Sequence, residues 1–172
     1  MNRALSFSTI ALLGRANLKH AREEEYVEWA THMLEEGHET PSLCILAGLE
    51  PLLNHFEIQD YFKRSLRELG IERKQKEEEI RIYATETVRH ILDESIDYKT
   101  GVSLLSSVCI SCDYPSYLMD WYSLDDAISD IESGNYPNGY PSAYGRNPKA
   151  VVLEIATDFL AKHKNTESNK TR

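Results

Sequence analysis

Apolar residues recur at intervals of three or four positions along nearly the whole chain, and this period predicts amphipathic helices rather than strands. The longest periodic segments are residues 22–36, 57–69, 72–94 and 148–163. Glycine follows three of the expected helices, at Gly37, Gly70 and Gly134, which is where helices commonly end. No segment shows the strict alternation that is typical of a strand. We therefore predict an all-α fold built as a multi-helix bundle.

Shorter helices are predicted where capping residues precede apolar runs. Thr100 is expected to cap a helix over residues 101–112, and Ser123 is expected to open a helix that ends before Gly134. The charged run over residues 72–79 is interpreted as the solvated first two turns of the helix that it begins, with Glu and Lys supporting each other at helical spacing.

The first residues of the chain form a further candidate helix. Its apolar positions share one face: Leu5, Leu12, Leu13 and Ala16. A basic start followed by apolar residues also resembles a secretory signal peptide. Ser6, Ser8 and Thr9 interrupt the apolar run, however, and Arg15 stands where a small cleavage-site residue is required. We therefore expect a short helix that packs on the domain. Since no run approaches the roughly 18 apolar residues of a spanning helix, we expect no membrane partner.

Two parts of the chain share a weak internal similarity. Residues 28–37 align with residues 86–95, and each segment is followed by an apolar helix and then by a third helix. We predict two stacked three-helix pseudo-repeats, at about residues 21–70 and 72–134, between an N-terminal and a C-terminal capping helix. Chance similarity between amphipathic helices is the alternative.

The same segments resemble a group of small uncharacterised all-helical bacterial proteins. The residues that carry the resemblance are 28–49, 56–62, 68–70, 91–101, 114–115 and 124–126. It covers about residues 26–134 and implies a bacterial helical domain. The group has no assigned activity, so the resemblance supplies no catalytic residues.

Charge is distributed unevenly along the 172 residues. The formal net charge of −9 consists of +4 over residues 1–22, −16 over residues 23–160 and +3 over residues 161–172. Such an acidic body does not favour a nucleic-acid partner, whose phosphates require a basic face. It suits a basic protein partner, although solubility is the alternative explanation. We expect a single domain over residues 1–163 and a disordered basic tail over residues 164–172.

Three cysteines cannot form a disulfide framework, so we expect a reducing compartment and place the protein in the cytoplasm. Cys109 and Cys112 have the spacing of a redox pair, and with Cys44 and a histidine they could hold zinc. They lie at the end of an expected helix, however, where the helix dipole disfavours a thiolate. They also continue its apolar stripe. We interpret them as core residues.

Two of the expected helices carry a glutamate, then a histidine four residues later, then an acid three residues after that. The two sets are Glu28, His32 and Glu35, and Glu86, His90 and Asp93. Carboxylates and histidines on facing helices can build a metal site. At about 100° per residue, however, each set lies opposite the apolar side of its helix. We interpret both sets as solvated faces and expect no cofactor; a metal site is the alternative.

Six of the ten tyrosines and one tryptophan lie between residues 114 and 144. They are Tyr114, Tyr117, Trp121, Tyr122, Tyr136, Tyr140 and Tyr144. The loop after Gly134 mixes tyrosine with Asn, Gly, Ser and Pro, a composition typical of binding loops. Asp125 and Asp126 make the same region acidic. We predict that this region binds a partner; the alternative is that the rings cover helix ends and leave their hydroxyls in water.

These patterns together favour a non-catalytic domain that binds another macromolecule, and a protein in particular. The sequence contains no Gly-rich phosphate loop, no serine nucleophile elbow and no zinc-protease helix motif. The alternative is a helical-bundle enzyme or ligand-binding protein that depends on a metal held by the Glu/His pairs.

Overall fold

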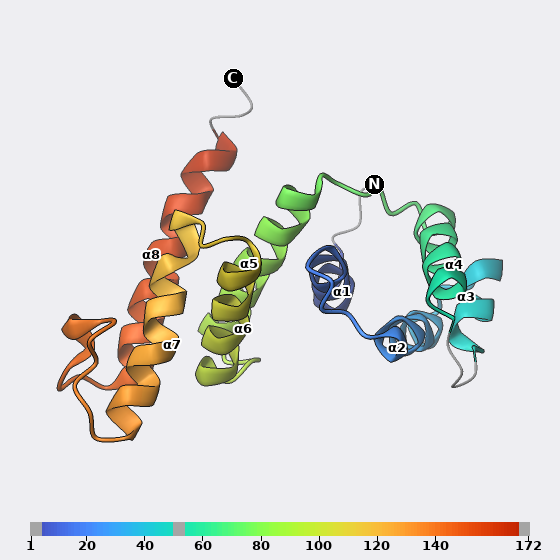
Figure 1. Ribbon diagram of the computed structural model, residues 1–172. Coiled ribbons are helices and arrows are strands. Elements are labelled where there is room, and N and C mark those ends of the chain that lie inside the picture. Colours follow the sequence, from blue (N-terminus) through green and yellow to red (C-terminus); the bar gives the residue numbers. More distant parts are fainter. Residues whose placement is uncertain (1–4, 50–53, 169–172) are drawn as a thin grey trace. The chain divides into compact units, whose positions relative to one another are not determined.

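The computed structural model describes residues 5–49 and 54–168, with side chains described as far as residue 163. These residues form helices and no strand, which confirms the predicted all-α multi-helix bundle (Figure 1). The α-helices are α1 (Phe7–Asn17), α2 (Glu23–Glu35), α3 (Pro41–Ala47), α4 (His55–Glu68), α5 (Lys76–Leu92), α6 (Tyr98–Ser111), α7 (Met119–Glu132) and α8 (Pro148–Ser168). Two short 3₁₀ helices, η1 (Ser116–Leu118) and η2 (Pro141–Ala143), accompany them. Within the described ranges, no helix is long and apolar enough to cross a membrane.

The chain divides into two compact units, Met1–Tyr83 and Ala84–Arg172. The boundary lies inside α5, so these units do not coincide with the predicted pseudo-repeats over residues 21–70 and 72–134. Each pseudo-repeat does contain three α-helices, α2 to α4 and α5 to α7. The internal similarity and the single domain over residues 1–163 stay predictions.

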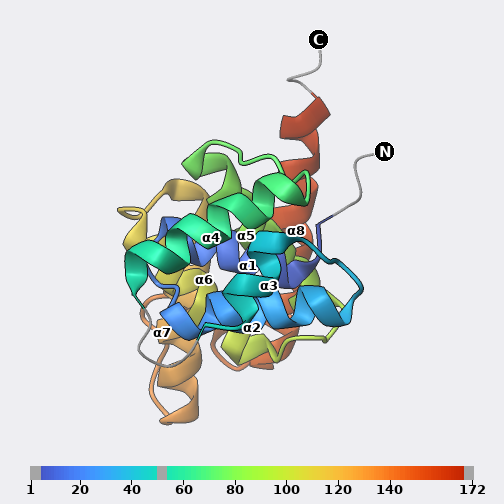
Figure 2. The same cartoon turned by 90° about the vertical axis from the view of Figure 1, so that its right-hand side faces the viewer.

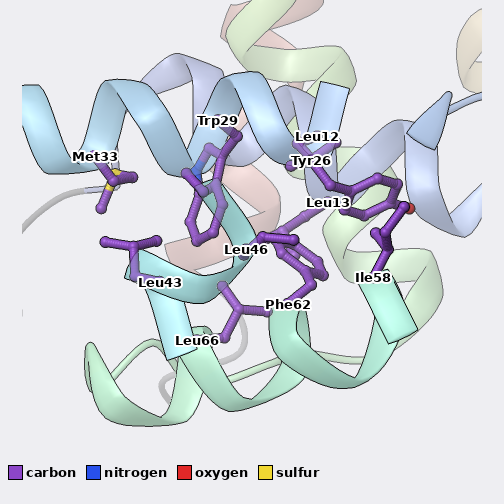
Figure 3. Close-up of a cluster of buried hydrophobic side chains, with 11 residues drawn as sticks. Leu12, Leu13, Tyr26, Trp29, Met33, Leu43, Leu46, Ile58, Phe62 and Leu66 are labelled. Carbon is purple, nitrogen blue, oxygen red and sulfur yellow. The ribbon is translucent and has the colours of Figure 1, made fainter. Parts of the chain in front are cut away.

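The core of the first unit is built from apolar side chains of α1 to α4 that point toward one another (Figure 3). Phe62 on α4 is its centre, because the rings of Tyr26 and Trp29 on α2 meet it edge-on, with centroids at 4.9 and 5.0 Å. Helix α3 lies between α2 and α4 and contributes Leu43 and Leu46 (Figure 2). Edge-to-face aromatic packing of this kind adds about 1 kcal/mol per pair beyond the burial of apolar area.

Helix α1 approaches the first unit's part of α5 very closely at Gly14. A Cβ atom at this position would lie 2.5 Å from Cβ of Tyr83, so only glycine leaves the required space. The same helix is tied to α2 by a buried hydrogen bond, in which the indole N–H of Trp29 donates to Oγ1 of Thr9 at 2.9 Å. The predicted N-terminal helix is present as α1, and its Leu12 and Leu13 side chains are buried.

The charged segment before α5 contains a buried carboxylate. The prediction that residues 72–79 are solvated is wrong for Glu79, whose side chain is 5% exposed. Arg73 donates from Nε and Nη2 to its two oxygens at 2.7 Å, and Asn17 at the end of α1 donates at 2.6 Å. The backbone N–H of Lys74 donates at 2.9 Å. These bonds tie the segment that precedes α5 to both α1 and α5.

The second unit packs α6 against α7, with α8 in contact with both. Trp121 is its largest fully buried side chain and meets Phe159 of α8 at a centroid distance of 5.8 Å. Gly101 on α6 lies against Ile91, since an added Cβ would come within 2.4 Å of Cγ1 of that residue. An ion pair between Lys99 and Glu132 joins the start of α6 to the end of α7.

Three predicted helix ends differ from the observed ones. Helix α6 is capped by Asp97 rather than Thr100, because the Asp97 carboxylate accepts the backbone N–H groups of Lys99 and Thr100. Helix α7 begins at Met119, directly after η1, so Ser123 lies inside it. Helix α8 ends at Ser168, beyond residue 164, where a disordered tail was predicted to start. Residues 169–172 lie outside the described residues.

Replacing Glu79 with Gln keeps its size and removes its charge. We expect the free energy of unfolding at neutral pH to fall by about 2 kcal/mol, because Arg73 loses its ion pair. Burial opposes ionisation of Glu79, but the bonds from Arg73, Asn17 and Lys74 outweigh burial, so the pKa of Glu79 lies below its ordinary value. Its stabilising effect is thus full above the unfolded-state pKa and disappears as pH falls through the folded-state pKa. Urea titrations at several pH values should show the difference between wild type and E79Q shrinking below about pH 4.

The matched control for this experiment is Glu78→Gln. Glu78 pairs with Lys74 at 2.6 Å, but its side chain is 49% exposed. Exposed helical ion pairs contribute only about 0.5 kcal/mol, so the control should unfold almost like wild type at every pH. Equal losses for the two variants would contradict the assigned role of Glu79.

Gly14→Ala should destabilise the protein by about 1–3 kcal/mol, although Ala favours helices more than Gly does. The reason is the clash of the new methyl group with Cβ of Tyr83, an atom that cannot move without the α5 backbone. Gly101→Ala is the comparison, since the nearest atoms that its methyl group meets, Cγ1 and Cδ1 of Ile91, lie farther from the backbone than the Cβ of Tyr83 does. Urea unfolding should show the larger loss for Gly14→Ala, and equal or reversed losses would show that α1 can shift.

Candidate functional site

The loop between α7 and α8 folds back beside α7 (Figure 1). Pro137 and Ala143 anchor it, since both are buried. Between them the chain passes so close to α7 that a Cβ at Gly139 would lie 3.3 Å from the backbone oxygen of Ser123. The short helix η2 over Pro141–Ala143 gives part of the loop regular structure. The loop therefore contacts the N-terminal half of α7 in addition to being joined to α7 and α8 at its two ends.

Two pairs of tyrosine rings are presented by this region. Tyr136 and Tyr144 lie at opposite ends of the loop, yet their ring centroids are 4.9 Å apart and the side chains are 49% and 64% exposed. Tyr114, which follows α6, meets Tyr122 of α7 edge-on at 5.3 Å and is 47% exposed. The structure thus brings together the rings of residues that are not adjacent in sequence.

The backbone that carries Tyr114 is held in an unusual conformation. Asp113 and Tyr114 both have positive φ, at 59° and 54°, a region that L-residues other than Asn and Asp rarely adopt. The N–H of Tyr114 donates to the backbone oxygen of Cys109 at 3.0 Å, and that of Asp113 donates to Ile110 at 3.2 Å. These two bonds are the pattern that closes a helix C-terminus, so the end of α6 determines where the Tyr114 ring lies.

Three of the predicted binding residues are covered to different degrees. Trp121 is completely buried against Phe159, so it packs α7 onto α8 and cannot contact a partner. The prediction that Trp121 is a binding residue is therefore wrong. Its indole N–H has no hydrogen-bond acceptor within the described part of the chain. Tyr117 is half-buried and lies 5.8 Å from the His163 ring. Tyr140 is also half-buried, and burial followed by the charge of Asp120 raises the pKa of its hydroxyl.

The residues that remain accessible are called the Tyr-rich face. They are Tyr114, Tyr117, Tyr122, Tyr136, Tyr140, Tyr144, Asp125 and Asp126. The segment that carries these residues is negatively charged, because residues 100–145 contain six acids and no Lys, Arg or His. Among the side chains described, Glu132 alone of these six acids has an ion-pair partner, which is Lys99. The carboxylates of Asp120, Asp125, Asp126 and Asp130 therefore carry charge that no described cation of the chain neutralises.

The two Glu/His sets are arranged differently from each other. Their members are Glu28, His32 and Glu35 on α2, and Glu86, His90 and Asp93 at the end of α5. The first set is exposed. In the second, Glu86 pairs with Arg89, while the His90 ring and the Asp93 carboxylate both contact the Ser95 hydroxyl. No group of three or more His, Cys, Asp or Glu suited to a metal is found in the described ranges.

The cysteines occupy three different environments. Cys44 is exposed, Cys109 is buried and Cys112 is intermediate. Cys112 is the C-cap of α6, so the pair lies at the negative end of the helix, as the sequence predicted. Burial, and then the neighbouring Cys112, raise the pKa of the Cys109 thiol. Both effects keep Cys109 protonated at neutral pH.

A groove in the first unit was not found from the sequence. It has a volume of about 670 Å³ and lies at the end of α4, where Lys63, Arg67 and Arg73 border the apolar residues Leu66 and Ile71. The spacing of Lys63 and Arg67 places them on one side of α4, which is the signal that the sequence offered. Arg73 is already engaged by Glu79, so part of this positive charge is internally neutralised.

Thiol titration should distinguish the exposed Cys44 from the buried Cys109. We expect Cys44 to react rapidly with a chromogenic disulfide at neutral pH, and Cys109 to react only after denaturant is added, because its thiol is buried and its pKa is raised. In Cys44→Ser the rapid phase should disappear and the denaturant-dependent phase should remain. Rapid reaction of Cys109 in the folded protein would contradict its placement in the core.

Comparisons with protein families, with curated proteins and with solved structures give no match for this chain. The resemblance to small bacterial helical proteins therefore stays a prediction, as does the cytoplasmic location. The geometry of the Tyr-rich face is consequently the basis for inferring a function.

Proposed function

We propose that the chain is a non-catalytic domain that binds another protein through its Tyr-rich face. The observation that supports this function is the pair of partly exposed ring contacts, Tyr136 with Tyr144 and Tyr114 with Tyr122, in a segment that has acids and no cations. Tyrosine is enriched at protein interfaces because one ring offers a large apolar area and a polar hydroxyl.

The attachment of the loop favours binding energetically. Ordering a loop on association costs conformational entropy, and preorganisation reduces that cost. Here Pro137 and Ala143 are buried, and Gly139 lies against α7. Tyr136 and Tyr144 are the direct chain neighbours of these two buried residues, so their backbone is already positioned in the unbound chain. Tyrosine side chains also have only two rotatable χ angles to immobilise, which makes them efficient contact residues.

The charge of the face favours a basic partner. Four aspartates of α7, at 120, 125, 126 and 130, have no ion-pair partner among the residues described. A complementary basic surface would be attracted at long range, and this attraction raises association rates at low ionic strength. The expected location is the cytoplasm and the expected source is bacterial.

Replacing Tyr136 and Tyr144 with Ala together should weaken capture of the partner at least tenfold while leaving helicity unchanged. Both rings are about half exposed or more, so their loss removes contact area rather than core packing. The measurement is affinity capture from a soluble extract of the native host, with the captured proteins quantified by mass spectrometry and helicity followed by circular dichroism.

Phe56→Ala is the matched control, because Phe56 is 83% exposed and lies in the first unit. Capture by this control should equal that of wild type. Capture should also fall as salt is raised, since charges on exposed groups are screened within a Debye length of about 10 Å at 0.1 M salt. The proposed function fails if the Tyr136/Tyr144 double variant captures the same proteins as wild type.

A further inference from the structure

We propose that the Tyr-rich face selects arginine side chains of its partner over lysine side chains. This inference rests on the proposed function and specifies the chemistry of the partner. It follows from how the chain's own arginines are bound, together with the carboxylates and rings that the face leaves without a cation.

The first internal example is on α4. The guanidinium of Arg64 lies 5.7 Å from the centroid of the Tyr61 ring, and its Nη2 pairs with Oδ2 of Asp60 at 2.6 Å. One guanidinium therefore contacts an aromatic ring and a carboxylate at the same time. Both contacts suit the guanidinium group, which is planar, stacks on rings and forms directional bonds to carboxylates.

The second internal example adjoins the face itself. Nη2 of Arg146, which follows the loop, pairs with Oε2 of Glu154 on α8 at 2.6 Å. Arg146 follows Tyr144 by two positions, so this ion pair adjoins the end of the loop that carries the Tyr-rich face. A guanidinium thus already pairs with a carboxylate at the border of that face.

The Tyr-rich face also presents a ring and carboxylates on one side of a helix, but in a different order and without an arginine. Asp125 and Asp126 follow Tyr122 by three and four positions on α7, so they lie on the same side of the helix as its ring. On α4 the corresponding position, three residues after Tyr61, holds Arg64. Among the ion pairs and ring contacts of the described residues, none joins a cation to Tyr122, Asp125 or Asp126, so these groups are open to a guanidinium from another molecule.

Lysine fits the same place less well. Its ammonium is compact and strongly hydrated, so it loses more hydration on stacking and forms only point contacts with a carboxylate. Tyr136 and Tyr144 extend the ring area available to a second guanidinium, since both rings are exposed. From the usual strength of cation–π contacts at exposed sites, we expect arginine to be preferred by about fivefold.

The test uses the full chain and two synthetic peptides of matched length, which alternate glycine with arginine or glycine with lysine. Calorimetry at low ionic strength gives both affinities, and the arginine peptide should bind about fivefold tighter. Replacing Tyr122 with Leu and Tyr136 and Tyr144 with Ala should make the two affinities equal. Replacing Asp125 and Asp126 with Asn should weaken both peptides, and Phe56→Ala should change neither affinity.

The outcomes separate this inference from the proposed function. Equal binding of the two peptides to wild type overturns the arginine preference. Absence of binding by either peptide also overturns it, and in both cases the proposed function stands if the Tyr136/Tyr144 double variant still loses partner capture. A preference for arginine that persists in the tyrosine variants places the selective site elsewhere and overturns the inference as well.

Discussion

The packing of Trp121 against Phe159 is the contact on which the Tyr-rich face depends. It holds α7 against α8, and these two helices carry the two ends of the loop that bears Tyr136, Tyr140 and Tyr144. With both ends fixed, the entropy of closing the loop has already been lost on folding. The buried residues Pro137 and Ala143 then need to hold only short stretches of chain in place. The position of the candidate binding surface therefore depends on the packing of the core of the second unit.

The carboxylate of Glu79 and the aspartates of α7 lie in opposite electrostatic environments. In the first unit the buried carboxylate of Glu79 is surrounded by donors from Arg73, Asn17 and Lys74, so its charge is satisfied within the fold. In the second unit the aspartates of α7 are accessible and have no described partner. Repulsion among such charges lowers stability slightly, and association with a basic molecule would remove that repulsion. The paired charge of Glu79 thus stabilises the fold, while the unpaired charges of the α7 aspartates are available to a binding partner.

The sequence predicted the elements with a clear period and missed features that depend on distant residues. The all-α fold and the helix stops before Gly37, Gly70 and Gly134 follow from local patterns, since each of these glycines has positive φ. The burial of Glu79 could not be read locally, because Asn17, which bonds to it, lies 62 residues away.

The candidate site shows the same limit. Six tyrosines in one segment were visible, but composition does not distinguish Trp121, which is buried, from Tyr144, which is 64% exposed. The pairing of Tyr136 with Tyr144 requires the loop to close, and no local signal specifies that closure. Asp97 was missed as the N-cap of α6 because Thr100, which is also a residue type preferred at N-caps, lies only three residues later.

The left-handed backbone at Tyr114 has a consequence for how this chain balances stability against surface chemistry. An aromatic residue at φ 54° costs about 1–3 kcal/mol that glycine at the same position would avoid. Glycine would keep the N–H donation to Cys109 and therefore the closure of α6, but it would remove the ring that meets Tyr122. The substitution Tyr114→Gly would thus relieve the backbone strain, lose the ring contact with Tyr122 and reduce the aromatic surface. The strain at this turn is the thermodynamic cost of displaying that ring.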